Sequence, residues 1–312
     1  MISVSRRSFL SVSAAASWSL ARQGVAAAAE DDLPFKISLA QWSLNRHFFG
    51  RGDAEKLDPL DFAPIAKRRC GIDAIEYVNQ FYFDHVGNPG YLAELKKRAE
   101  GEGVQSLLIM CDREGNLGDP DTRKRVTAVR NHIKWLEWAA ELGCHSIRVN
   151  AASDARLSYL EQGKLASDGL RRLCEIADTY DLNVIVENHG GLSSHGRWLR
   201  TVIEGVAHPR AGTLPDFGNF HIRRTGRGDF PLEYDRYLGT YELMPFAQGV
   251  SAKSNEFDED GNEVHTDYER MLRIVHASGF RGYVGIEFEG GGDSFEGIEK
   301  TKQLLLRVRA TL

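Results

Sequence analysis

Short apolar runs alternate with longer stretches of helical periodicity along most of the chain. Successive apolar runs begin roughly thirty to forty residues apart, which is the period of a strand followed by a helix. The eight runs are residues 36–42, 72–78, 105–110, 146–150, 183–187, 211–216, 247–252 and 283–288. The run at 183–187 is apolar up to its final acid, as expected of a parallel strand that is covered on both faces.

Helical patterns fill the gaps between these runs. Residues 122–142 and 165–180 place apolar side chains at i, i+3, i+4 and i+7, which predicts two amphipathic helices. The alternation predicts a single α/β domain, either a (β/α)8 barrel or a long doubly wound sheet. After the first run, residues 43–47 read Ser-Leu-Asn-Arg-His, so no glycine-rich nucleotide-binding loop follows it. We therefore favour the barrel.

The first thirty residues differ from the rest and predict an export signal. Residues 5–10 read Ser-Arg-Arg-Ser-Phe-Leu, a twin-arginine pattern, and a mildly apolar stretch follows at 12–20. The small residues at 24–29 offer Ala-x-Ala cleavage sites. Twin-arginine signals are export addresses that a receptor reads. We expect a twin-arginine signal peptide at 1–30, a barrel at 31–312, and a mature protein that is periplasmic or otherwise extracytoplasmic.

Composition narrows the class of partner. The 312 residues carry a net charge of −5, which argues against nucleic acid because phosphate binding relies on clustered Lys and Arg. Beyond the leader, no apolar run approaches the ~20 residues that span a bilayer, so we expect no membrane association after the signal is removed. The four cysteines show no CxxC spacing. We expect buried free thiols rather than a zinc ribbon.

Acidic residues stand at the ends of the late apolar runs. Glu187, Asp216 and Glu287 each close a run, and Lys253 follows another. An ionised group at the end of a buried strand is costly without a partner. In a barrel the carboxyl ends of the strands meet at one face, so these four side chains share one pocket. A single strand-end acid is equally consistent with an exposed loop carboxylate, but three in matching places favour a site for a divalent cation.

Several polar residues accompany these acids and are candidate substrate contacts. They are Arg148, Asn150, His189, Asn219, His221 and Lys253. Lys253 could stabilise an oxyanion or pair with an acid. Each histidine could be a ligand, a sugar contact, a proton shuttle or a structural residue.

Four segments resemble a known family. Residues 187–191 read Glu-Asn-His-Gly-Gly, 215–219 Pro-Asp-Phe-Gly-Asn, 251–254 Ser-Ala-Lys-Ser and 285–289 Gly-Ile-Glu-Phe-Glu. They resemble the sugar phosphate isomerase/epimerase group, which has the xylose isomerase-like TIM barrel, and the likeness extends over the mature chain. The resemblance implies one divalent metal ion (Mn, Mg, Co or Zn) on Glu187, Asp216 and Glu287. It also implies that Glu187 and Glu287 move the substrate proton.

The chain departs from this family at one ligand. Ser251 stands where the family usually places a metal-binding histidine, and a neutral hydroxyl is a poorer ligand than imidazole. Three explanations remain open at the level of sequence. The three acids and water hold the ion, a nearby His189, His221 or Gln248 replaces the histidine, or the chemistry has changed.

These observations predict an exported, divalent-metal-dependent sugar isomerase or epimerase that transfers a proton next to a carbonyl. The alternatives are a lyase or isomerase acting on 3-keto sugars or glycosides, and a catalytically silent carbohydrate-binding barrel. An abasic-site endonuclease on the same barrel is disfavoured, because the chain is acidic and carries an export signal. The expected partner is a small carbohydrate. Which sugar, carbon and metal are used, and whether the chain forms a homo-oligomer, stay open.

Overall fold

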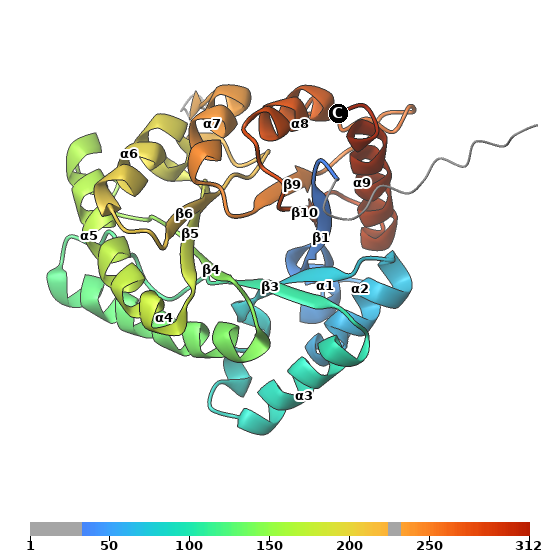
Figure 1. Cartoon of the computed structure of the whole chain (residues 1–312), viewed down its shortest axis with the longest axis horizontal. Coiled ribbons are helices and arrows are strands. Elements are labelled where there is room, and N and C mark those ends of the chain that lie inside the picture. Colours follow the sequence, from blue (N-terminus) through green and yellow to red (C-terminus); the bar gives the residue numbers. More distant parts are fainter. Residues whose placement is uncertain (1–32, 224–231) are drawn as a thin grey trace, which may run out of the picture. The chain divides into compact units, whose positions relative to one another are not determined.

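Eight parallel strands form one curled sheet at the centre of the computed structural model (Figure 1). They are β1 (Lys36–Ala40), β2 (Ala74–Val78), β3 (Gln105–Met110), β4 (Ser146–Val149), β5 (Asn183–Glu187), β6 (Ala211–Leu214), β9 (Val250–Ser254) and β10 (Tyr283–Phe288). Their order across the sheet is β6-β5-β4-β3-β2-β1-β10-β9, so each strand from β1 to β5 pairs with the next along the chain. All eight predicted strands are present within a few residues of their predicted bounds.

The two outer strands of this order meet and close the barrel. Parallel bridges join Thr213 to Ala247 and Asp216 to Ser251. Backbone hydrogen bonds run from Ser251 N to Pro215 O at 2.9 Å and from Phe217 N to Ser251 O at 3.0 Å. A doubly wound sheet would leave these strands as free edges. The prediction of a (β/α)8 barrel is therefore confirmed.

The structure describes residues 33–223 and 232–312. Residues Pro34–Leu312 form one compact unit. The predicted signal peptide at 1–30 lies outside the described residues and stays a prediction. Within the described part, no helix is long and apolar enough to cross a membrane.

Helices surround the strands (Figure 1). They are α1 (Asn45–Phe49), α2 (Phe62–Cys70), α3 (Pro89–Gly101), α4 (Thr122–Leu142), α5 (Tyr159–Ala177), α6 (Gly196–Val206), α7 (Arg236–Leu243), α8 (Tyr268–Ala277) and α9 (Ser294–Arg309). The helix predicted at 122–142 has the bounds of α4, and Gly143 ends it with a φ of 74°. The helix predicted from residue 165 begins earlier, because Ser158 and Glu161 form a capping box at its start.

A short antiparallel pair interrupts the βα alternation after β6. It consists of β7 (His221–Arg223) and β8 (Leu232–Glu233). The pattern of apolar runs did not predict it, because strands of two or three residues carry no usable periodicity. It lies in the connection that follows Asp216, so it belongs to the same end of the barrel as the strand-end acids.

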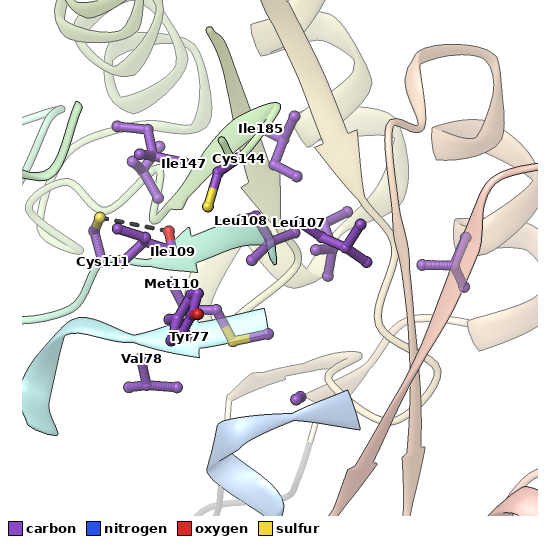
Figure 2. Packing of buried hydrophobic residues seen from close by; sticks show 14 of the residues in the cluster. Tyr77, Val78, Leu107, Leu108, Ile109, Met110, Cys111, Cys144, Ile147 and Ile185 are labelled. Carbon is purple, nitrogen blue, oxygen red and sulfur yellow. Dashed lines mark hydrogen bonds between the residues drawn. The ribbon is translucent and has the colours of Figure 1, made fainter. Parts of the chain in front are cut away.

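The barrel interior and the layer under the helices are both apolar. Figure 2 shows this around β3, where Leu108, Ile109 and Met110 are buried between β2 and β4. Side chains of one strand point alternately into the barrel and toward the helices, and both directions are covered here. The four cysteines are buried and free, as predicted. This packing holds the strand ends in fixed positions.

Candidate active site

Three carboxylates converge at the carboxyl ends of the strands. Glu187 ends β5, Asp216 lies two residues beyond β6, and Glu287 lies near the end of β10. One oxygen from each lies within 4.8 Å of the others, and all three side chains are buried. The structure therefore brings together the three residues that the sequence placed at one metal site. Their roles in metal binding and catalysis remain predictions.

The turn after β6 fixes the direction of Asp216. Its Oδ1 accepts hydrogen bonds from the backbone N–H groups of Gly218 at 2.8 Å and Asn219 at 2.7 Å. The backbone of Asp216 is held in turn by the side chain of Asn188, which accepts from its N–H and donates to its carbonyl. These bonds occupy Oδ1, and Oδ2 contacts Ser251 and Lys253.

Ser251 lies between two of the acids. Its Oγ is 2.8 Å from Asp216 Oδ2 and 2.8 Å from Glu287 Oε2. A hydroxyl has one proton to donate, so both contacts are hydrogen bonds only when one carboxyl is protonated. Burial raises the pKa of Asp216 to about 8 and that of Glu187 to about 7. Burial alone would raise the pKa of Glu287 too, but Lys253 and Ser251 hold it below its ordinary value.

The ammonium of Lys253 is buried beside the same acids. Its Nζ lies 3.6 Å from Glu287 Oε2, 3.7 Å from Asp216 Oδ2 and 3.1 Å from Glu289 Oε2. Burial alone would lower the pKa of Lys253, but Asp216 and Glu287 raise it well above its ordinary value. The lysine therefore stays positively charged in the folded protein.

Arg148 connects the acids to a second polar group. Its Nε lies 2.7 Å from Glu187 Oε2, and its Nη1 donates to Asp112 Oδ1 at 2.9 Å. The first contact is an ion pair without hydrogen-bond alignment, since neither atom has a hydrogen-bond partner within the described residues. The other oxygen of Glu187 accepts from Asn219 Nδ2 at 2.9 Å. Glu187 Oε2 is thus a buried carboxylate oxygen whose hydrogen-bonding capacity is unused.

Asp112 receives several donors at the end of β3. Besides Arg148, Asn150 Nδ2 donates to its Oδ1 at 2.9 Å, and Gln80 Nε2 to its Oδ2 at 3.2 Å. Burial opposes ionisation of Asp112, but Arg148 holds the pKa of its carboxyl well below the ordinary value. Arg148 and Asn150, predicted as substrate contacts, are both bound to this aspartate.

Neither His189 nor His221 belongs to the group of acids that could share one ion. His189 is exposed at the rim, and partial burial of its ring together with the charges of Arg148 and Lys253 lowers its pKa, which favours a neutral imidazole. His221 lies on β7, with its Nδ1 2.7 Å from Glu233 Oε1. Among the described residues, the only group of acid, histidine or cysteine atoms close enough to share an ion is the three acids. Neither histidine therefore replaces the missing ligand in this structure.

Gln248 does not replace the missing ligand either. It precedes β9, and its Cγ would lie 2.9 Å from a Cβ on Gly212, near the start of β6. That is the amino end of the barrel, opposite the acids. Of the three explanations for Ser251, substitution by Gln248 is therefore wrong for geometric reasons.

Three acids near the site were not singled out from the sequence. Asp112 follows β3 as Glu187 ends β5, so the strand-end argument could have found it. Glu289 lies two residues after Glu287 and therefore on the same side of the chain. Glu76 lies within β2, and an acid inside an apolar strand was the available signal.

Glu76 is buried inside the barrel. Its Oε1 accepts from Ser38 Oγ at 2.6 Å, and its Oε2 has no hydrogen-bond partner among the described residues. Gly285 makes room for it, since a Cβ there would lie 2.4 Å from Glu76 Oε1. Burial raises the pKa of Glu76 to about 7.

The donor set fits a divalent ion. Oxygen ligands at ~2.0–2.6 Å from one ion lie no more than about 5 Å apart, and the three acids meet that limit. Among the described residues, Glu187 Oε2 accepts no hydrogen bond and is ion-paired with Arg148 Nε, so an ion bound there would share this oxygen with the guanidinium. Carboxylate oxygens suit Mg²⁺, Mn²⁺ and related ions. Asp216, Glu187 and Glu287 are therefore the residues that could hold a metal.

Comparison with known proteins agrees with this architecture. Residues 66–308 match the protein family described as the xylose isomerase-like TIM barrel. No curated protein sequence matches the chain.

Solved structures give the same fold. The 3-keto-D-glucoside 4-epimerase of E. coli is 17% identical, with a TM-score of 0.64 over 88% of this chain and 99% of its own. An L-ribulose 3-epimerase is 14% identical, with a TM-score of 0.67 over 89% and 95%. A xylose isomerase-like TIM barrel protein from Mycobacterium smegmatis in complex with magnesium is 16% identical, with a TM-score of 0.63 over 89% and 97%. At these identities the likeness establishes the fold alone.

Proposed function

Because the chain belongs to the xylose isomerase-like TIM barrel family, and sugar epimerases share its fold, we propose that it is a divalent-metal-dependent sugar isomerase or epimerase. The observation that carries this proposal is the meeting of Glu187, Asp216 and Glu287, buried and within 4.8 Å of one another. Three acids in so small a volume repel one another unless a cation or protons neutralise them. A bound divalent metal ion would neutralise this repulsion.

Glu187, Asp216 and Glu287 would hold the ion. When bound, a divalent ion polarises a carbonyl oxygen of the sugar and stabilises the negative charge that develops on it. Ser251 keeps two of these carboxylates in place through its hydroxyl. Asn219 does the same for Glu187.

Glu187 and Glu287 are the residues we assign to proton transfer. Epimerisation next to a carbonyl needs a base at one face of the reacting carbon and an acid at the other. The two glutamates come from β5 and β10, so they approach the site from different strands. In the metal-free protein, burial raises the pKa of Glu187 to about 7, so this carboxyl can hold a proton near neutral pH until a cation binds.

Other side chains would bind the sugar. Lys253 can donate to an oxygen that becomes negative during the reaction, since its ammonium stays charged. Arg148 on β4, Asn150 just after β4 and His189 two residues after β5 lie at the same end of the barrel as the acids, where they would contact hydroxyl groups. Asn219 and His221 follow Asp216 and are assigned to the same task. Mutation of each, followed by measurement of KM and kcat, separates binding from chemistry.

The twin-arginine pattern in the leader supports a location outside the cytoplasm. Residues 5–10 and the small residues before position 30 form the expected order of an export signal. Replacement of Arg6 and Arg7 by lysine should keep the protein in the cytoplasm. Cell fractionation tests this, and periplasmic recovery of the double variant would contradict it.

A second substrate class is favoured by a cavity beside the site. The cavity has a volume of about 570 Å³ and is lined by Glu289, Phe257, Phe288 and the glycines at 290–292. Glu289 also bonds to Lys253, so the cavity adjoins the acids. Ligand pockets typically measure ~300–1,000 Å³. A 3-keto glycoside, whose second group would extend beyond the reacting ring, is therefore the second candidate.

Metal content of the purified mature protein is the decisive measurement. About one Mn, Co, Zn or Mg ion per chain is expected, with loss of the ion in Glu187→Ala. Glu204→Ala, on the exposed face of α6, is the matched control and should keep the metal. Deuterium uptake from solvent at the reacting carbon then distinguishes free ketoses from 3-keto glycosides. Sugar binding that is unaffected by chelation, with no metal and no turnover, would instead identify a silent carbohydrate-binding barrel.

A further inference from the structure

The ammonium of Lys253 faces the oxygens that a metal ion would need. Its Nζ lies 3.6 Å from Glu287 Oε2 and 3.7 Å from Asp216 Oδ2, the two oxygens that Ser251 also contacts. Arg148 cannot serve them, because it is engaged by Asp112 and Glu187. Of the described cations, Lys253 is the one paired with both Asp216 and Glu287.

We propose that Lys253 is an internal cation that competes with the divalent metal ion for Asp216 and Glu287, and that Glu289 sets the balance by drawing the ammonium toward the rim. This inference rests on the metal site proposed above. It adds that metal affinity is tuned by a charge within the chain. A buried cation and a metal ion this close repel each other strongly, because little water screens them.

The distances show where the ammonium is held. Lys253 Nζ donates a hydrogen bond to Glu289 Oε2 at 3.1 Å, while its contacts with the other two acids are longer ion pairs. Glu289 therefore gives the ammonium a partner away from the metal ligands. When a metal ion binds, the lysine can keep this hydrogen bond and give up only the longer contacts.

Glu289 is itself anchored. Its Oε1 accepts a hydrogen bond from Trp42 Nε1. The indole of Trp42 packs edge-on against Phe49, with ring centroids 6.1 Å apart, and also contacts Phe81. An exposed carboxylate without such an anchor would not hold the ammonium in one place. Trp42 therefore contributes to positioning Lys253 through Glu289.

Gly218 leaves space for the lysine stem. A Cβ at this position would lie 3.0 Å from Lys253 Cδ and 3.1 Å from its Cγ. The stem therefore lies closely against the turn that follows Asp216. The methylene chain is confined, so the ammonium is the part of the side chain that can move. It can shift between Glu289 and the two metal ligands.

Titration calorimetry with Mn²⁺ on the metal-depleted mature protein tests the proposal. Lys253→Met should bind Mn²⁺ at least about tenfold more tightly, and Glu289→Gln about tenfold more weakly, each a shift that calorimetry resolves. Glu256→Gln is the matched control, because Glu256 lines the same cavity and pairs with His265 and Val264 rather than with Lys253. Its affinity should stay within about twofold of wild type.

The outcomes separate this inference from the metal site itself. Binding that is lost in Asp216→Asn but unchanged or weakened in Lys253→Met would leave the metal site standing and overturn the competition. A wild type that takes no Mn²⁺, with a Lys253→Met variant that does, would support the competition in its strongest form. Absence of binding in both would overturn the metal site and the competition together.

The test does not depend on one variant. If thermal unfolding shows that Lys253→Met does not fold, the Mn²⁺ affinities of Glu289→Gln and Trp42→Phe test the proposal. Trp42→Phe removes the indole donor and keeps an aromatic ring, so Mn²⁺ affinity should fall in the same direction as in Glu289→Gln and by less. An unchanged affinity in both variants would overturn the role of Glu289.

Discussion

Two buried charge groups lie at the same end of the barrel and are built in opposite ways. In the first, Arg148, Asn150 and Gln80 all donate to Asp112. The pKa of that carboxyl is held well below its ordinary value, because Arg148 outweighs the effect of burial. In this group the donors outnumber the single carboxylate, so Asp112 is neutralised without a metal ion.

In the second group the acids are in excess. Asp216, Glu287 and Glu289 share the single ammonium of Lys253. Burial raises the pKa of Asp216 to about 8, so the metal-free group needs a proton or a further cation. The difference teaches that burial alone does not make a site. A carboxylate that its donors neutralise is structural, whereas carboxylates that outnumber the neighbouring cations can bind a further cation.

Breaking the acid-rich group should have the largest effect on activity. Glu187→Gln and Glu287→Gln each remove a proton-transfer group and a metal ligand, so kcat should fall by about 10²–10⁴-fold. Steady-state kinetics on the identified sugar measures this. Glu204→Gln, an exposed helix glutamate, should retain wild-type turnover. Full activity in both site variants would mean that other residues carry the proton.

Replacing Arg148, which contacts both Asp112 and Glu187, should have the largest effect on stability. Arg148→Met leaves Glu187 and Asp112 buried without their cation, so the free energy of unfolding should fall by ~3–5 kcal/mol. Urea denaturation of the metal-free protein measures it. The exposed pair of Arg200 with Glu204 is the comparison, and Arg200→Met should cost no more than ~0.5 kcal/mol. Equal losses in the two variants would contradict the importance of the buried pair.

Adding a metal-binding side chain beside the acid-rich group should raise its affinity for a divalent ion. Ser251→His introduces an imidazole where the hydroxyl now contacts Asp216 and Glu287, so Mn²⁺ or Zn²⁺ affinity should rise by at least about tenfold. Ser251→Ala removes the hydroxyl without adding a ligand and serves as the control. An affinity that rises equally in both variants would show that the hydroxyl competes with the metal rather than that histidine binds it.

The last prediction concerns the pH dependence of stability. The pKa of Glu76 is raised from 4.5 to about 7, chiefly by burial, so between these values the folded protein holds a proton that the unfolded chain has lost. The free energy of unfolding therefore falls as pH rises across this window, by up to ~1.4 kcal/mol per pH unit for one such group.

Glu76→Gln should make that slope shallower, because glutamine does not titrate. Denaturation midpoints of the metal-free protein from pH 4.5 to 7 measure the slope. Glu100→Gln, on the exposed face of α3, should leave it unchanged. An identical slope in wild type and Glu76→Gln would show that Glu76 stays ionised in the fold.

The barrel and the three acids could be predicted because their signals are local. Each strand shows as an apolar run, and Glu187 and Glu287 each stand at the end of one. The rule that parallel strand ends meet at one face then brings them together. Glu76 and Glu289 each carried a local signal, an acid within or just after an apolar run, but the sequence does not show which partners such an acid contacts.

The sequence by itself therefore determined the order of the eight barrel strands, the barrel and three of the strand-end acids. Only the tertiary structure decided which side chains pair with these acids. In it Arg148 donates to Asp112, Ser251 lies between Asp216 and Glu287, and Lys253 donates to Glu289. Periodicity depends on neighbours along the chain, which the sequence displays directly. Side-chain pairing depends on how the barrel closes between β6 and β9, and residues more than thirty positions apart meet only when it does.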